Sequence, residues 1–302
     1  HINFSSVLSF SLYFDHTVII NKSGQAFAIG NNKEGQISPN LPKQVFTKET
    51  EISIQNQNGQ PFKFLSAVCG ENYTLYEATI GTSKDPQLIF VTKNQNSIFV
   101  DVNGRTPTSL YGGQSTSASI DSEGGIIIIT ERILSSHNGK AMVKFLPSNE
   151  KAVQVACCEE FIVVLGISGR LFTSSISNGG EMINFKEVVE LKGNKITWIS
   201  GKYMHCIAVC EDGKVFGRGN NSNSRLGINK SESVKFTEIK SLNKKSKIVA
   251  ADAGLGHSLF KSSDGKVFAC GSNFYGHLLL KKTGKNAVFP PTETLSFCND
   301  PF

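Results

Sequence analysis

Short apolar runs separated by polar turns recur along the whole chain. One example is the β-branched, apolar run at residues 206–210 (CIAVC), whose polar boundaries are typical of a short strand. An Asp212-Gly213 pair separates this run from a second apolar pair, Val215-Phe216. An Asp-Gly pair between two apolar runs predicts a β-hairpin with a type I′ turn, in which both central residues have positive φ. No stretch keeps the i, i+3, i+4 spacing of an amphipathic helix, so we expect short antiparallel strands and little helix.

This hairpin pattern is repeated at a fixed spacing. His257 follows His205 by 52 residues, and a fixed internal period of this size indicates a repeat architecture. Gly124 and Gly169 occupy the turn position in two further units, and a turn without glycine is expected near Gln87, which gives six units. Three copies share a histidine, a turn glycine and a second glycine where two backbones approach closely: His16, Gly24 and Gly30; His205, Gly213 and Gly219; and His257, Gly265 and Gly271.

The repeated residues resemble those of a known family. The motif His-(seven residues)-Gly-x-x-Phe-x-x-Gly, followed by Asn, is similar to the repeat of the regulator-of-chromosome-condensation (RCC1) family. The match is close near residues 16–38, 205–227 and 257–279, whereas Thr116 and Phe161 occupy the histidine position in the middle of the chain. In that family each repeat is one blade of a β-propeller. The resemblance therefore implies an all-β, RCC1-like β-propeller of about six four-stranded blades, with a seventh outside this sequence if the chain is a fragment.

The six predicted blades follow one another along the chain. Residues 6–11 alternate between apolar and polar and predict the first strand, which should line the inside of the ring. The rest of blade one should include an outer strand from residues 42–46 and 51–54, and the run at 126–129 should be a strand buried on both faces. Blade two is assigned to residues 62–91 with a further strand at 98–102, blade three to 109–130, blade four to 152–174 and blade five to 196–242. Blade six is assigned to residues 248 to the end, and its outermost last strand is expected near 294–297.

The length and the boundaries of the chain fit one domain. All-β rings commonly reach this length as one domain, and no Pro-, Gly- or Ser-rich linker interrupts the sequence, so residues 1–302 are expected to form a single propeller domain. The first residues lack a Met and the features of a signal peptide, so we expect an internal boundary or a tag remnant there and a longer natural protein. No apolar run reaches the length of about 18 residues that a membrane span requires.

The cysteines are predicted to be buried free thiols and not partners in disulfide bonds. Their number is odd and none forms a C-x-x-C pair, which does not suit a disulfide framework. Free cysteine behaves as a small buried hydrophobe, so we expect reduced, buried thiols and an intracellular location, in the cytoplasm or the nucleus. The seven are Cys69, Cys157, Cys158, Cys206, Cys210, Cys270 and Cys298.

No residue pattern predicts catalysis or a bound metal. The copies of the histidine lie in different repeats, so they cannot converge on one ion, and each is expected to donate from its ring to a backbone carbonyl of the next blade. The segment Gly256-His257-Ser258 has Phe260 where a nucleophile elbow needs glycine, and Gly217-Arg218-Gly219 lacks the third glycine of a phosphate loop. We therefore expect no catalytic residue, no cofactor and no metal ligand.

Positive charge is concentrated in the last third of the chain. Residues 192–302 hold 17 Lys and Arg against 8 Asp and Glu, whereas residues 1–191 hold 14 against 17. One sector of the ring should therefore be basic, and it is a candidate surface for nucleic acid or an acidic protein. The alternative is a solvated surface that only maintains solubility, because no aromatic residues are interleaved for base stacking. The candidate residues are Lys244, Lys245, Lys247, Lys281, Lys282 and Lys285, with Arg218 and Arg225 nearby.

The sequence therefore favours a non-enzymatic, monomeric β-propeller scaffold that binds another protein. This interpretation rests partly on the fold. The resemblance also implies an alternative, because some propellers of this family are guanine-nucleotide exchange factors for a small Ran-type GTPase and bind chromatin. That activity uses an inserted hairpin wedge, and no insertion of that size follows the glycine-asparagine loops of the three closest repeats. The longer insertion at residues 79–86 comes before its strand.

Overall fold

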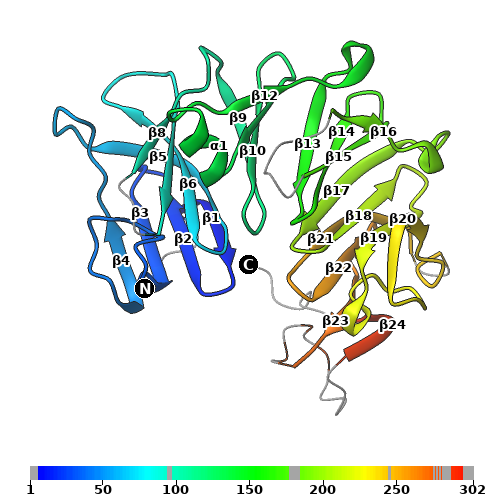
Figure 1. Ribbon diagram of the computed structural model, residues 1–302. Coiled ribbons are helices and arrows are strands. Elements are labelled where there is room, and N and C mark those ends of the chain that lie inside the picture. The colour runs from blue at the N-terminus through cyan, green and yellow to red at the C-terminus, as the bar shows by residue number, and fades with distance from the viewer. Residues whose placement is uncertain are drawn as a thin grey trace. The chain divides into compact units, whose positions relative to one another are not determined.

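The strands form six four-stranded antiparallel sheets (Figure 1). The computed structural model describes residues 6–93, 97–176, 184–243, 246–274, 276, 278, 280 and 287–294. In every sheet the spatial order of the strands follows their order along the chain. Each sheet corresponds to one predicted repeat and is called a blade below, so the prediction of six four-stranded units is confirmed.

The chain divides into two compact units, of which the first contains blades one to three. Its blades are β1 (Val7–Tyr13), β2 (His16–Asn21), β3 (Ala26–Asn31) and β4 (Val45–Ile52); β5 (Phe62–Cys69), β6 (Tyr73–Ile80), β7 (Gln87–Thr92) and β8 (Ile98–Val100); and β9 (Pro107–Gly112), β10 (Ser117–Asp121), β11 (Ile126–Ile129) and β12 (Met142–Lys144). One short helix, α1 (Glu131–Ser136), connects β11 to β12. It begins where the Thr130 side chain accepts a hydrogen bond from the backbone N–H of Ile133, as helix N-caps do.

The second unit contains blades four to six. Its strands are β13 (Ala152–Cys157), β14 (Phe161–Gly166), β15 (Leu171–Ser175) and β16 (Lys186–Glu187); β17 (Ile196–Lys202), β18 (His205–Cys210), β19 (Val215–Asn220) and β20 (Glu232–Glu238); and β21 (Ile248–Ala253), β22 (His257–Ser262), β23 (Val267–Ser272) and β24 (Ala287–Glu293). Three single turns of 3-10 helix lie in its connections, at Pro147–Asn149, Val189–Leu191 and Ser222–Ser224.

Three predicted boundaries differ from the structure. The outer strand of blade one is continuous over β4 instead of broken between residues 46 and 51. The outermost strand of blade six, β24, ends at Glu293, just before the predicted residues 294–297, of which 295–297 lie outside the described residues. The connection between β6 and β7 begins with Gly81 at a φ of 57°, so blade two does have a glycine in the turn that was predicted to lack one.

Several inner strands are buried along their whole length. All four residues of β11 are buried, which confirms the prediction for residues 126–129. All six residues of β14 and of β18 are buried as well. Along β18 the side chains alternate between blades: Ile207 and Val209 pack with Phe260 of blade six. Cys206 and Ala208 pack with Val163 of blade four. Interblade packing therefore forms a continuous core within the second unit.

The turns between the second and third strands are not the predicted type I′ turns. At Gly213 the backbone N–H bonds to the carbonyl of Cys210, and the Cys210 N–H bonds to the carbonyl of Lys214. Only Gly213 has a positive φ, 91°, whereas Asp212 does not. This pattern is a type I turn followed by a glycine in a G1 bulge, for which one left-handed residue is sufficient. The same two hydrogen bonds occur at Gly24, Gly124, Gly169 and Gly265.

The second repeated glycine allows two backbones to touch. Gly30, Gly219 and Gly271 have φ values of 108–112°. A Cβ on Gly219 would lie 2.1 Å from the carbonyl oxygen of Met204, and the corresponding distance from Gly30 to the Asp15 oxygen is 2.2 Å. The following residue uses this approach, because the Asn220 N–H bonds to the same Met204 carbonyl at 2.9 Å. Glycine is therefore required here by contact as well as by conformation.

The two classes of glycine should differ in their cost of substitution. Gly265→Ala should destabilise the protein by about 1 kcal/mol, because nothing lies within 4 Å of the new Cβ and only the φ of 84° is strained. Gly219→Ala should cost at least about 3 kcal/mol, because the new Cβ also meets backbone. Urea unfolding of both variants measures the difference, and equal losses would contradict this assignment.

Candidate binding site at the seam of blades four and five

Neighbouring blades are joined by a hydrogen-bonded hydroxyl at the first seam, where a seam is the interface between two consecutive blades. Nε2 of His16 in blade one lies 3.2 Å from Oγ1 of Thr74 in blade two. The Thr74 hydroxyl donates to the carbonyl of Gln36, which belongs to the β3–β4 connection of blade one, at 2.8 Å. One hydroxyl of blade two is thus held between two groups of blade one.

The seam between blades five and six repeats this arrangement. Nε2 of His205 lies 2.9 Å from Oγ of Ser258, which donates to the carbonyl of Arg225 at 2.7 Å. Because the hydroxyl proton goes to the carbonyl, the histidine must donate through Nε2–H. The sequence predicts a backbone carbonyl of the next blade as the acceptor; at these two seams Nε2 lies within hydrogen-bond distance of a hydroxyl of the next blade. A serine or threonine hydroxyl of the next blade lies between the histidine ring and a carbonyl of the histidine's own blade. This residue is the second residue of β6 or of β22.

A buried asparagine fixes the connection that supplies this carbonyl. The Asn221 amide accepts from the Leu226 N–H and donates to the Ile228 carbonyl. Asn32 does the same for its own connection, with the Ile37 N–H and the Ser38 carbonyl. Buried polar groups of this kind are stable when they are fully bonded, so each connection closes over its seam in a defined shape.

Burial strongly perturbs His205. Its side chain is fully buried, and burial, with the charges of Arg225 and His257, lowers the pKa of His205 to about 3. Among the described residues, its Nδ1 atom has no hydrogen-bond partner. A neutral ring with a proton on Nε2 is consistent with both observations.

Both partners of this hydrogen bond are replaced at the seam between blades four and five. Phe161 occupies the histidine position and Cys206 occupies the position of Thr74 and Ser258. Neither side chain can form the bond. The guanidinium of Arg218, on β19, instead lies 4.4 Å from the centre of the Phe161 ring and donates to the Thr173 hydroxyl of blade four at 3.1 Å. A cation–π contact therefore replaces the hydroxyl bridge.

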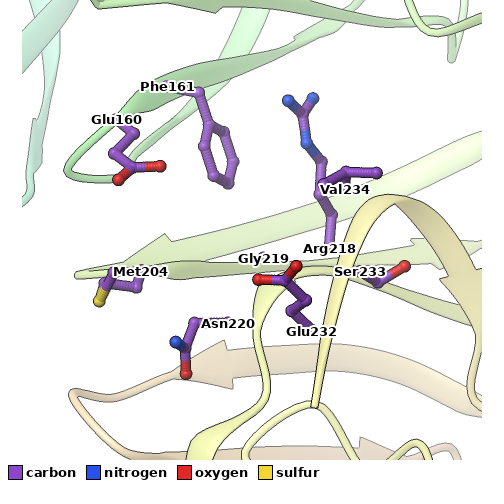
Figure 2. Close-up of a pocket in the computed structure, with 9 residues that line it drawn as sticks. All are labelled: Glu160, Phe161, Met204, Arg218, Gly219, Asn220, Glu232, Ser233 and Val234. Atoms are coloured by element: carbon purple, nitrogen blue, oxygen red, sulfur yellow. The ribbon is translucent and has the colours of Figure 1, made fainter. Parts of the chain in front are cut away.

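A cavity of about 210 Å³ opens beside this altered seam (Figure 2). It lies at the loop end of the blades, defined here as the end that carries the turns between first and second strands and the connections between third and fourth strands. The opposite end, which carries the turns between second and third strands such as that at Gly213, is called the hairpin end. The residues that line the cavity are Glu160, Phe161, Met204, Arg218, Gly219, Asn220, Glu232, Ser233 and Val234. In Figure 2 the Phe161 ring lies between the Glu160 carboxylate and the Arg218 guanidinium.

The charges around this cavity are not neutralised internally. Glu160 and Glu232 are both exposed. Neither carboxylate has a cationic group within 4 Å among the residues that the structure describes. Among the described residues, the Arg218 guanidinium likewise has no carboxylate within 4 Å, and its charge faces the Phe161 ring. The cavity thus combines two free carboxylates with the aromatic ring of Phe161 and the thioether of Met204.

The cysteines lie in the core instead of the cavity. The six cysteines in the described part of the chain are free and buried, as predicted, and Cys298 lies outside it. Burial raises the pKa of Cys157 to about 12 and that of Cys210 to about 12, which disfavours the reactive thiolate. No group of three metal-ligating side chains occurs among the described residues. None of the described helices is long and apolar enough to cross a membrane.

The predicted basic residues do not form one described patch. Lys244, Lys245, Lys281, Lys282 and Lys285 lie outside the described residues. The described residues next to these two groups of lysines lie at opposite ends of blade six. The backbone carbonyl of Lys247 accepts a hydrogen bond from the Ser263 N–H at the hairpin end, whereas Ser272 pairs with Ala287 at the loop end.

The two arginines of that candidate surface have local roles. Arg225 is 7% exposed and donates to the carbonyls of Leu255 and Ser222, so its inclusion in an exposed basic surface was wrong. Arg218 is half-buried and contacts Phe161. Lys247 is exposed, as predicted.

Sequence reasoning missed the cavity residues Glu160, Met204 and Glu232. A usable signal was present, because Phe161 departs from the histidine of the repeat and Cys206 departs from the hydroxyl residue at the same seam. Reading these two departures as a pair requires knowing that the two positions touch, which the structure supplies.

Comparisons with known proteins find similar sequences and folds. The family model described as the regulator of chromosome condensation (RCC1) repeat matches residues 248–276, within blade six. The probable E3 ubiquitin-protein ligase HERC6 of Homo sapiens is 39% identical over 88 residues, which are 28% of this chain and 8% of that protein. The X-linked retinitis pigmentosa GTPase regulator of Homo sapiens is 26% identical over 161 residues, which are 50% of this chain and 16% of that protein. The chain thus spans a small part of these relatives.

Two solved structures resemble nearly the whole chain. Human WBSCR16 superposes with a TM-score of 0.75 at 15% identity, covering 96% of this chain and 82% of that one. Prp20p from Saccharomyces cerevisiae superposes with a TM-score of 0.72 at 13% identity, covering 97% of this chain and 78% of that one. At these identities the likeness shows the fold alone.

The seam hydroxyl should be important for stability. Ser258→Ala should destabilise the protein by about 1–3 kcal/mol, because it leaves the buried His205 Nε2–H and the Arg225 carbonyl without partners. Ser263→Ala, an exposed serine in the adjacent turn, is the matched control and should change the free energy of unfolding by less than about 0.5 kcal/mol. Indistinguishable urea midpoints for the two variants would exclude this role.

His205 should make stability depend on pH. The folded-state pKa of about 3 lies below the ordinary value of 6.5, so the unfolded state binds the extra proton, and stability is lost as pH falls below about 6.5. Relative to His205→Gln, which keeps an N–H donor but does not titrate, the wild-type free energy of unfolding should fall by about 2–3 kcal/mol between pH 7.5 and 4.5. Parallel pH profiles for the two proteins would show that His205 accepts a proton when folded.

Proposed function

We propose that this chain, which carries RCC1-type repeats and has a six-bladed RCC1-like β-propeller fold, is a non-enzymatic scaffold that binds another protein. The proposed binding surface is the loop end of blades four and five. Residues 1–302 act in this proposal as one propeller domain and as a monomer. The buried, reduced thiols support a site of action inside the cell, in the cytoplasm or the nucleus.

The observation that carries this proposal is the open cavity at the altered seam. At the seams between blades one and two and between blades five and six, a hydroxyl bridge joins the blades beneath a closed connection. The seam between blades four and five instead presents a concave surface with unpaired charges beside Val234, which is 77% exposed. An apolar side chain beside a polar recess is a common form of protein recognition surface.

The hydrogen-bonded blades and the packing between them also support the proposed scaffold role. Each blade is a hydrogen-bonded sheet, and buried side chains fill the space between blades five and six. The loop end therefore presents its residues in fixed positions, which lowers the entropy cost of association. Among the similar proteins, Prp20p is described by its binding to Gsp1p and histones.

Nucleotide exchange on a small Ran-type GTPase, with chromatin binding, is the alternative. The observation that favours it is again the likeness to Prp20p and to a protein named as a GTPase regulator. Against it, the described parts of the β3–β4-type connections contain turns and helix but no added strand hairpin, which an inserted wedge would form. A nucleotide-release assay with several GTPases separates this activity from simple binding.

Polyanion binding is a further candidate that depends on the lysines of the last third. Lys247 is exposed, whereas Lys195, Lys214 and Lys266 at the same end already pair with Glu211, Asp212 and Asp264. These pairs leave less free positive charge than the sequence count indicates. If nucleic acid or an acidic peptide binds, the affinity should fall steeply with salt, and reversal of Lys247 and the neighbouring lysines to Glu should abolish it.

The proposed surface can be located by site-specific photocrosslinking. A photoreactive phenylalanine analogue at Val234 should capture a discrete protein partner in cells, because this side chain is 77% exposed at the loop end. The matched control is Ile167, which is 68% exposed in the β14–β15 turn at the hairpin end and should capture no such partner. Capture at Ile167 with none at Val234 would place the binding surface at the opposite end and refute the proposal.

A further inference from the structure

We propose that the cavity at the seam of blades four and five receives a single basic side chain, a lysine or an arginine, from the protein partner. This inference rests on the proposed function, because it assigns the chemistry that the same surface recognises. It is drawn from the charge, the lining and the size of the cavity.

The charge of the lining favours a cation. Glu160, in the β13–β14 turn, and Glu232, on β20, contribute two carboxylates that have no ion-pair partner among the described residues. The lining contains one cation, Arg218, whose guanidinium contacts the Phe161 ring and the Thr173 hydroxyl. Figure 2 shows this guanidinium across the ring from Glu160. A second positive charge that enters from the side of the carboxylates would therefore find unpaired acceptors.

The apolar part of the lining fits the stem of a long basic residue. Phe161 and Met204 present an aromatic ring and a flexible thioether to the cavity. Lysine and arginine bury their methylene stems against such surfaces while the charged head remains among polar groups, here the two carboxylates and the Asn220 amide. Neither a carboxylate side chain nor a purely apolar one would satisfy both parts of the lining.

The size of the cavity restricts the ligand to one side chain. Sites for drug-sized molecules and cofactors usually have volumes of about 300–1,000 Å³, larger than the 210 Å³ found here. The exposed Val234 at the rim provides an apolar contact for a residue that flanks the basic one. The recognised element is therefore a short segment with a basic residue next to an apolar residue.

Met204 provides a local probe of this binding. The chain contains three methionines: Met204 lines the cavity, Met142 lies on β12 of the first unit, and Met182 lies outside the described residues. With ¹³C-methyl-labelled methionine, the peptide acetyl-Ala-Lys-Val-Ala-amide should shift the Met204 methyl resonance in a saturable manner and leave Met142 unchanged. The arginine peptide should do the same, and the norleucine and glutamate peptides should not. The affinity should decrease as salt rises.

Matched variants test the two carboxylates. The double variant Glu160→Gln, Glu232→Gln should weaken binding of the lysine peptide roughly three- to tenfold, as expected for two exposed charge pairs. Both residues are exposed, so the fold should persist. Glu211→Gln is the control, because Glu211 is exposed but pairs with Lys195 at the hairpin end, and it should leave the affinity unchanged.

The outcomes separate this inference from the proposed function. Equal shifts by the lysine and norleucine peptides, preference for the glutamate peptide through Arg218, or no Met204 shift at all would each overturn the basic-side-chain assignment. If crosslinking at Val234 still captures a protein in these cases, the scaffold proposal stands and only the assigned chemistry is wrong. If the lysine peptide binds but Val234 captures nothing, the proposed function fails instead.

Discussion

A hydroxyl group held between a histidine and a loop carbonyl is the interaction on which much of this architecture depends. Strand pairing stabilises each blade internally, but it does not join one blade to the next. At two seams, Thr74 and Ser258 place their hydroxyls where a ring nitrogen of the preceding blade donates and a carbonyl of the same blade accepts. The carbonyl is in position because a buried asparagine amide shapes the connection that carries it. Sheet, connection and neighbouring blade are thus fixed by one network, whose members are each satisfied only when all are present.

The candidate site lies at a seam where this network is missing. Phe161 and Cys206 fill the positions of the histidine and the hydroxyl with groups that do not form this bridge, and Arg218 supplies a contact of a different kind. The seam remains packed inside, where Val163 and Ala208 belong to the same core cluster. It is open only at the loop end, where Glu160 and Glu232 line a recess. A local departure from the repeat is therefore accompanied by a distinctive surface, while the strands beside it keep their pairing.

The regular features were predictable because they depend on short-range periodicity. The strands, the turn glycines and the number of blades follow from apolar runs that recur at one spacing, and Gly213 and Gly265 have the expected positive φ. The turn type was not predictable in the same way, since a type I′ turn and a type I turn with a bulge both favour glycine and differ only in the φ of Asp212. The seam partners and the burial of Arg225 depend on residues that are 30 to 58 positions apart. The helix α1 depends on one N-cap and on the burial of Ile133 and Leu134. It is too short to show the amphipathic pattern from which a helix is usually predicted.

The paired replacement at the seam of blades four and five also limits how such a chain can evolve. Changing the histidine alone leaves a buried hydroxyl that has lost its donor, and changing the hydroxyl alone leaves a buried N–H and a carbonyl without partners. Because the bridge is lost when either group is replaced, the costs of the two replacements are expected not to add. We therefore expect positions 161 and 206, which are 45 residues apart and belong to one core cluster, to be epistatic. A blade of this kind can acquire a new surface only by a route that crosses a destabilised intermediate, or in a background stable enough to tolerate one.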